Sequence, residues 1–231
     1  LAVGAVAVRG KVSDAGHWSL TLDQLDWRNA DISMRGAGRW DAGGGDAGQA
    51  DFQGTIAQAQ LNAIYRYLPR EVDADARHWL AKGLQAGTLS NGHWLLQGDL
   101  DRFPFGEQPQ AGDFRVWGDF QDACIEFVPD APKGRSWPLL QGVTGTADLH
   151  RMDLRLTAST ARMEPLAGQV IRLGGLQARI PDLEHEATLQ VSGQTEADGG
   201  TYMALIRHTP IGRMLDGVFD EASAAGDWQV P

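Results

Sequence analysis

Apolar and polar residues alternate along much of the chain with a period of two. The alternation is clear in separate runs at residues 18–23, 94–101, 114–117, 152–159 and 187–192. A period of two is typical of strands that bury one face, because successive side chains point to opposite sides of a sheet. No regular exchange of strands with long helices is present, so the sequence predicts about a dozen antiparallel strands in a meander.

Turn-forming residues separate these runs, at residues 14–16, 41–48, 91–92 and 197–200. The glycine-rich stretch 36–45 lacks the Lys-Ser/Thr pair of a phosphate-binding loop, so it predicts a flexible hairpin loop. These signals support a chain of hairpins.

Three or four short helices interrupt the predicted strands. The first covers residues 61–68, where apolar residues have helical spacing. Asp73 or Asp75 can cap a second helix that ends before Gly87, and a third helix follows Thr209. The helices are too few to cover the whole sheet: a dozen strands spaced by about 4.8 Å span roughly 58 Å, whereas a helix is only about 10 Å across. The sequence therefore predicts a mainly β fold whose sheet either closes on itself or remains an elongated open groove.

The apolar positions of the strands are the candidate binding surface. Their place in the alternation alone selects Trp18, Leu20, Leu22, Trp94, Leu96, Leu154, Leu156, Leu189 and Val191. If the groove is open, these side chains would hold acyl chains through the hydrophobic effect. If it is closed, they would form the core of a structural or assembly scaffold.

An ordered series of short motifs resembles the YhdP family, an AsmA-like group. The motifs are Tyr67-Leu68-Pro69, Trp79-Leu80, Gly87, Gly98, Asp101-Arg102-Phe103-Pro104-Phe105, the strands 114–117 and 123–129, and then 178–182 and 208–210. The resemblance covers about residues 30–231.

This resemblance implies a repeating-β-groove protein that moves phospholipid between the inner and outer membranes of the Gram-negative envelope. It implies a periplasmic location, an anchor in the inner membrane through an amino-terminal helix absent from this sequence, and contact with a partner at the outer membrane. The family supplies no catalytic residue. The closed-core alternative becomes, in this setting, an envelope scaffold.

We expect the chain to be a single β-groove segment, residues 1–231, of a longer protein. It starts at Leu1 without an initiator methionine. Residues 64–69 resemble residues 205–210, and each stretch leads into a short helix and then a strand. This match predicts about one sheet-plus-helix repeat over 55–200, with flanks 1–54 and 201–231.

Charge and candidate chemistry narrow the function further. The formal net charge of −10 argues against nucleic-acid binding, which needs clustered Lys and Arg. Cys124 is the only cysteine, so the chain cannot form an intramolecular disulfide. His185-Glu186 lacks the second histidine of a zinc-protease motif, because Leu189 stands in its place. We therefore expect no metal, no cofactor and no enzymatic activity. The Phe103-Pro104-Phe105 segment predicts an exposed turn that braces the end of a strand.

Overall fold

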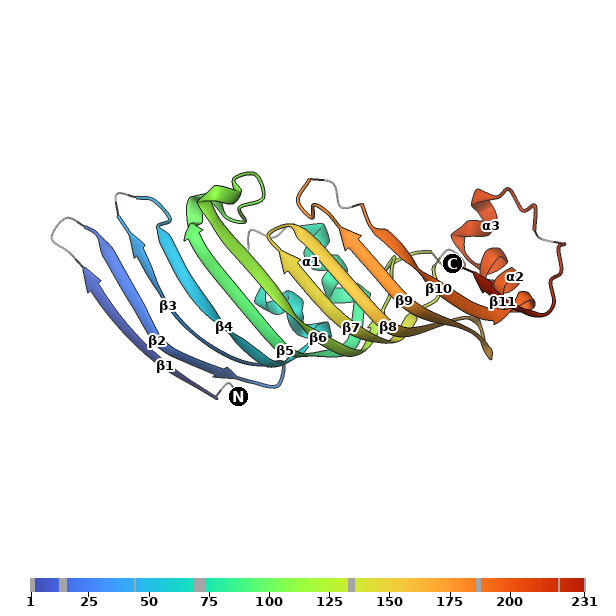
Figure 1. Cartoon of the computed structure of the whole chain (residues 1–231), viewed down its shortest axis with the longest axis horizontal. Helices are drawn as coiled ribbons and strands as arrows, with labels where there is room; N and C mark the ends of the chain where they lie inside the picture. The colour runs from blue at the N-terminus through green and yellow to red at the C-terminus, as the bar shows by residue number, and fades with distance from the viewer. Residues whose placement is uncertain are drawn as a thin grey trace.

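The computed structural model describes residues 3–12, 16–43, 45–68, 74–132, 136–185, 188–219 and 221–230. Eleven strands form one sheet in which each strand pairs with the next along the chain (Figure 1). Every pair is antiparallel. The strands are β1 (Val3–Val12), β2 (Trp18–Arg28), β3 (Ile32–Ala42), β4 (Gln49–Gln60), β5 (Leu84–Asp99), β6 (Gly112–Ile125), β7 (Leu140–His150), β8 (Asp153–Leu166), β9 (Gln169–Ile180), β10 (Gln190–Asp198) and β11 (Asp227–Val230).

Helices lie in two longer connections of this meander. The first connection, between β4 and β5, holds the 3-10 helix η1 (Leu61–Tyr67) and α1 (Ala74–Gly83). The second, between β10 and β11, holds α2 (Gly199–His208) and α3 (Pro210–Met214). Two single-turn 3-10 helices, η2 (Leu100–Arg102) and η3 (Pro109–Ala111), lie between β5 and β6. The predicted mainly β fold with few short helices is confirmed.

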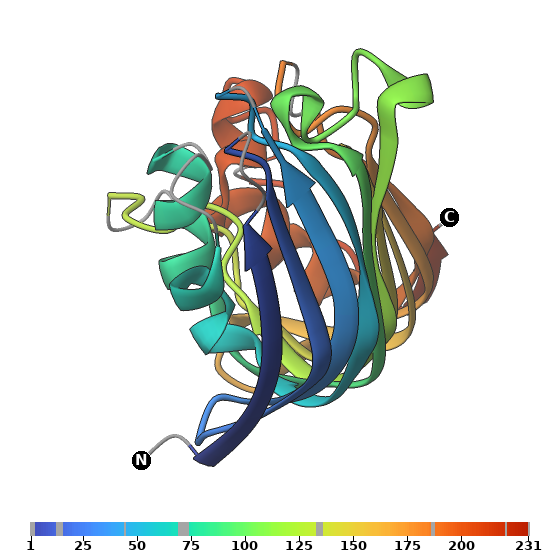
Figure 2. The same ribbon diagram turned by 90° about the vertical axis from the view of Figure 1, so that its left-hand side faces the viewer.

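The sheet is strongly curved and does not close. Figure 2 shows that the strands bend around the side on which η1 and α1 lie. We call this side the concave face and the opposite side the convex face. Side chains of directly paired residues lie on the same face of an antiparallel sheet, so the strand register assigns paired residues to a face.

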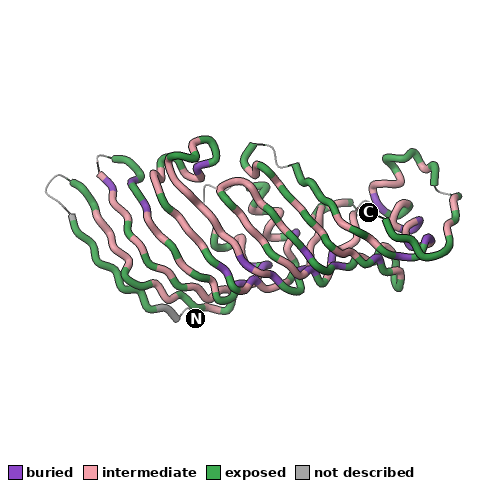
Figure 3. The backbone as a smooth tube through the Cα atoms, viewed as in Figure 1, coloured by how far each residue is buried: buried purple, intermediate pink, exposed green. Residues whose placement is uncertain are grey.

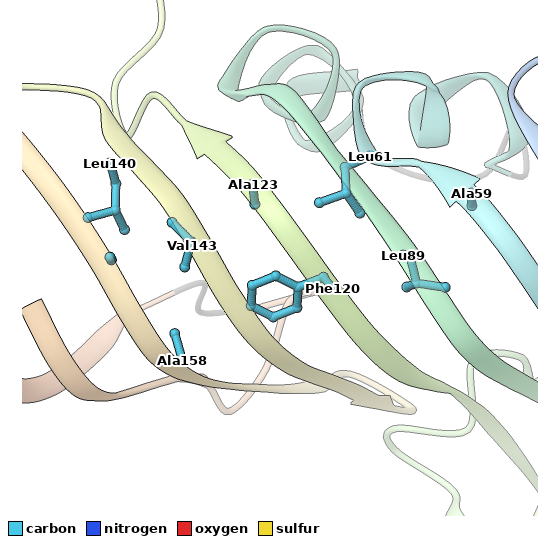
Figure 4. Close-up of a cluster of buried hydrophobic side chains, with 9 residues drawn as sticks. Ala59, Leu61, Leu89, Phe120, Ala123, Leu140, Val143 and Ala158 are labelled. Carbon is cyan, nitrogen blue, oxygen red and sulfur yellow. The ribbon is translucent and has the colours of Figure 1, made fainter.

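The buried core lies on the concave face, where η1 contacts β4 and β5 and α2 contacts β8 and β9. It contains Leu61 of η1 together with Leu89, Phe120, Val143 and Ala158 from successive strands (Figure 4). Figure 3 shows that most buried residues of the sheet gather at one end of the central strands, with a few, such as Ala42 and Ala50, at the other end of β3 and β4. Leu61 is 8% exposed and Phe120 is 6% exposed, so the concave face is sealed in its central part.

Several local predictions were wrong. Gly36 and Gly38 lie within β3 rather than in a hairpin loop. Asn91-Gly92 is not a turn but an irregularity inside β5, where Asn91 has a φ of 50° and the register with β6 shifts. An extra residue with positive φ is a common way to bend a strand without ending it.

The end of the second predicted helix was also misplaced. Gly87 lies three residues inside β5, which begins directly after α1. Its φ is 119°, and a Cβ there would lie 2.7 Å from Ala123 Cα and 2.8 Å from Leu61 Cδ1. Glycine is required because β5 approaches β6 and η1 closely at this point. Asp73 lies outside the described residues.

Phe105 is not exposed, in contrast to the prediction for the 103–105 turn. Its side chain is 0% exposed, and a Cβ at Gly112 would lie 2.6 Å from its ring. Phe103 contacts both Phe105 and Phe114 edge to face, with ring centroids 5.9 and 5.2 Å apart. The segment packs onto the start of β6.

Candidate functional site

The concave face is mainly apolar from β1 to β9. One row of paired residues crosses the strands from β1 to β9 as Val6, Leu25, Gly36, Gly54, Trp94, Val116, Leu149, Leu154 and Ile180. The row beside it, from β1 to β6, contains Val8, Leu22, Gly38, Phe52, Leu96 and Phe114. Each row contains only apolar residues and glycine. The rows run across the strands and therefore along the groove.

The register places the sequence-predicted lining residues on this face. Leu20 and Trp18 of β2 pair with Trp40 and Ala42 of β3 and continue the alternation of Leu22. Leu156 pairs with Ala178, which in turn pairs with Val191 of β10. Leu189 precedes β10 by one residue and is 45% exposed. Leu189 has no strand pairing that assigns it to a face; the other eight candidates thus share one surface, although they are distributed along it rather than gathered in one pocket.

Sequence reasoning missed part of this surface. Val6, Val8, Leu25, Met34 and Phe52 lie on the concave face but were not selected. In β2 the register shifts between Leu22 and Leu25, which breaks strict alternation. In β3 and β4, Gly36, Gly38 and Gly54 occupy inward positions and interrupt the apolar pattern.

Cover over the concave face is uneven. On β1 and β2, Val6 is 55% exposed, Val8 48% and Trp18 55%. In the centre, Val143 is 3% exposed within the buried cluster, which also contains Leu61 of the helical connection between β4 and β5. That connection is fastened to the segment after β6, because Trp79 Nε1 donates to Phe127 O at 3.0 Å and Lys82 pairs with Asp130 at 2.7 Å. The groove is therefore open at its amino-terminal end and closed on one side in its central part.

The convex face is polar and carries ion pairs between strands. Arg115 donates two hydrogen bonds to Asp148 at 2.8 and 2.7 Å, which lowers the pKa of that carboxyl. Arg179 and Arg155 both bind Asp153 at 2.9 and 2.7 Å and lower its pKa to about 2. Such a face is suited to water, so the two sides of the sheet differ sharply in polarity.

A polar cavity of about 560 Å³ lies at the ends of β7, β8 and β9. Its lining includes Glu107, His150, Arg151, Asp182 and His185. These groups pair largely with one another or with neighbours: His150 lies 2.7 Å from Asp113, and Asp182 raises the pKa of His185. Among the described residues no group of three or more His, Cys, Asp or Glu side chains could hold a metal ion.

Cys124 lies on β6 and is half-buried. Burial raises the pKa of its thiol, which therefore stays protonated near neutral pH. The thiol is a packing group in this setting.

A family model described as "YhdP protein" matches residues 3–230, nearly the whole chain. The chain belongs to the YhdP family. No curated protein and no solved structure gives a significant match. Membership of the YhdP family fits an envelope protein of the lipid-transport type. In the part of the chain that the structure describes, no helix is both long and apolar enough to cross a membrane.

Proposed function

We propose that the concave face is a conduit that holds phospholipid acyl chains and lets them pass along the groove, while the head groups remain in water. The observation that carries this proposal is the apolar surface that continues across the strands and stays open over β1 and β2. Transfer of a methylene group from water to such a surface contributes about 0.8 kcal/mol without directional chemistry. Large exposed apolar surfaces of this kind commonly mark binding sites.

The lining residues of this proposal are the sequence candidates together with their neighbours in the same rows. The conduit needs no catalytic group, and we assign the protein no enzymatic activity. Because lipid would leave one membrane and enter another, the setting we propose is the periplasm. The full-length protein would be anchored in the inner membrane and would meet a partner at the outer membrane.

A structural scaffold is the second candidate function. The buried cluster beneath η1 favours it, because Val143 and Ala123 are as well buried there as in an ordinary closed core. In this alternative the concave face would serve only to hold the sheet together.

Leu22→Asp tests the conduit. Leu22 lies on the concave face of β2, and an aspartate there would place a charge beside the acyl chains, where its solvation is poor. Thr21→Asp is the matched control, because Thr21 lies on the convex face between Arg9 and Arg39. Phospholipid that co-purifies with each folded variant would be measured by mass spectrometry. We expect a loss for Leu22→Asp and none for Thr21→Asp.

Two outcomes would contradict the conduit. A wild-type chain that carries no phospholipid and takes none from vesicles would favour the scaffold. Equal lipid in both folded variants would show that the concave face of β2 does not contact the chains.

A further inference from the structure

Three glycines leave a gap in the concave face of β3 and β4. Gly36 pairs with Gly54, and Gly38 pairs with Phe52, so three of these four inward positions lack side chains. This stretch lies outside the buried cluster of the central strands.

Two aromatic rings from the following strands occupy the gap. The Trp94 indole of β5 lies over both Gly54 and Gly36: a Cβ at Gly54 would be 2.6 Å from Trp94 Nε1, and a Cβ at Gly36 would overlap with Trp94 Cζ2. The Phe52 ring lies against Gly38 in the same way, since a Cβ there would overlap with its Cδ1. Aromatic side chains that cover cross-strand glycines in this manner stabilise sheets.

Packing rather than hydrogen bonding holds the indole in place. Trp94 Nε1 is buried and has no hydrogen-bond partner among the described residues. A buried N–H without an acceptor costs free energy, so this arrangement is retained despite a penalty. What the glycines supply is room: without them the indole would have to rise away from the strands toward the groove.

We propose that Trp94, seated on Gly36 and Gly54, is a positioning residue that sets the depth of the groove over β3 to β5 and contacts the passing acyl chain. The inference rests on the proposed lipid conduit. Seated over glycines, the ring lies lower than it would over a row of aliphatic side chains, and this makes the groove deeper here. A continuous apolar surface also offers no pocket that would hold one chain in place.

Fluorescence quenching tests the contact. The full chain would be mixed with vesicles of phosphatidylglycerol whose acyl chains carry bromine, and in parallel with vesicles of the unbrominated lipid. Bromine quenches indole fluorescence only at contact. We expect quenching in the wild type, and we expect the part due to Trp94 to be missing in Trp94→Phe.

Gly36→Ala tests the depth. At this position the nearest obstacle to a Cβ is the Trp94 side chain, whereas at Gly54 and Gly38 it is the backbone oxygen of Arg35 or Asp51. The new methyl group should lift the indole and reduce the phosphatidylglycerol taken from vesicles severalfold. Combining Gly36→Ala with Trp94→Leu should restore uptake, because the lifted ring is gone. Gly10→Ala is the control: Gly10 is on the same face, and its Cβ would meet only Ser19 O at 4.0 Å.

The possible results separate the two proposals. Lipid uptake by the wild type with no quenching of Trp94, or with no change in a folded Gly36→Ala chain, overturns the role of Trp94 and leaves the conduit. No uptake by the wild type overturns both. If Gly36→Ala does not fold, the quenching experiment on Trp94→Phe still decides whether the indole touches lipid.

Discussion

The concave face has an open part and a closed part, although the two share the same alternation of apolar residues. On β1 and β2 the inward side chains of Val6 and Trp18 are each 55% exposed. On β6 and β7 the inward side chains of Phe120 and Val143 are 6% and 3% exposed. Both parts are apolar, but only the second belongs to the buried cluster that also contains Leu61 of η1. The closed part therefore stabilises the fold, whereas the open part is the part of the surface that our proposal assigns to lipid.

A charge placed in each part should give the largest difference between the two parts in the free energy of unfolding. Leu89 belongs to the buried cluster, whereas Leu22 lies on the open side of the same face. We expect Leu89→Asp to lower the free energy of unfolding by about 4 kcal/mol or to prevent folding, because a buried carboxylate has no partner there. Leu22→Asp should cost only about 1 kcal/mol, since water reaches the charge. Urea denaturation measures both, and equal losses would mean that β2 is as closed as β5.

Added methyl groups should also destabilise the closed part more than the open part, but by a smaller amount than the charges. Gly87→Ala would push against Ala123 and Leu61, where η1, β5 and β6 meet, and would strain a backbone with a φ of 119°. We expect a loss of about 2 kcal/mol in the free energy of unfolding. Gly10→Ala in the open part has free space and should change it by less than about 0.5 kcal/mol. Thermal unfolding of the two variants provides the comparison, and a harmless Gly87→Ala would show that this junction is loosely packed.

The alternation in the sequence was sufficient to place Leu20, Trp94 and Leu154 on one face, because a regular strand turns alternate side chains to alternate sides. It could not show which part of that face is covered. Cover depends on where η1 and α2 fold back onto the sheet, and Leu61 joins the same buried cluster as Phe120 and Val143 only in three dimensions. Lipid contact by the candidate residues remains a prediction.

Glycine was the main source of error. The local preference of Gly36 and Gly38 is for a loop, yet both lie in β3. The rings of Trp94 and Phe52, from other strands, occupy the space that side chains at these positions would fill. Asn91-Gly92 resembles a turn for the same local reason, but strands on both sides of β5 keep it in the sheet. In each case pairing with neighbouring strands outweighs the local signal.

Acid should give the smallest of these effects on the free energy of unfolding. The sign of the effect follows from the pKa of Asp153. Arg179 and Arg155 lower this pKa from 3.8 to about 2. A carboxyl whose folded pKa is depressed stabilises the fold above its unfolded pKa, and that contribution is lost as the pH falls through its folded pKa. Both arginines are about half exposed, so screening by water should limit the contribution to about 1 kcal/mol.

Asp153→Asn isolates this contribution, because asparagine resembles the protonated carboxyl in shape and charge. Near pH 6 the variant should unfold about 1 kcal/mol more easily than the wild type, and the gap should close as the pH approaches 2. High salt near neutral pH should also narrow the gap, since the arginines are exposed. Asp23→Asn is the counterpart behind the open part, where Asp23 binds the exposed Arg9 on the edge strand β1. Its effect on unfolding should be smaller than that of Asp153→Asn, because a single pair at the sheet edge orders less of the structure. If Asp153→Asn shows no pH-dependent gap, the Arg155 and Arg179 contacts do not stabilise the sheet, and the concave side alone determines the stability of β8 and β9.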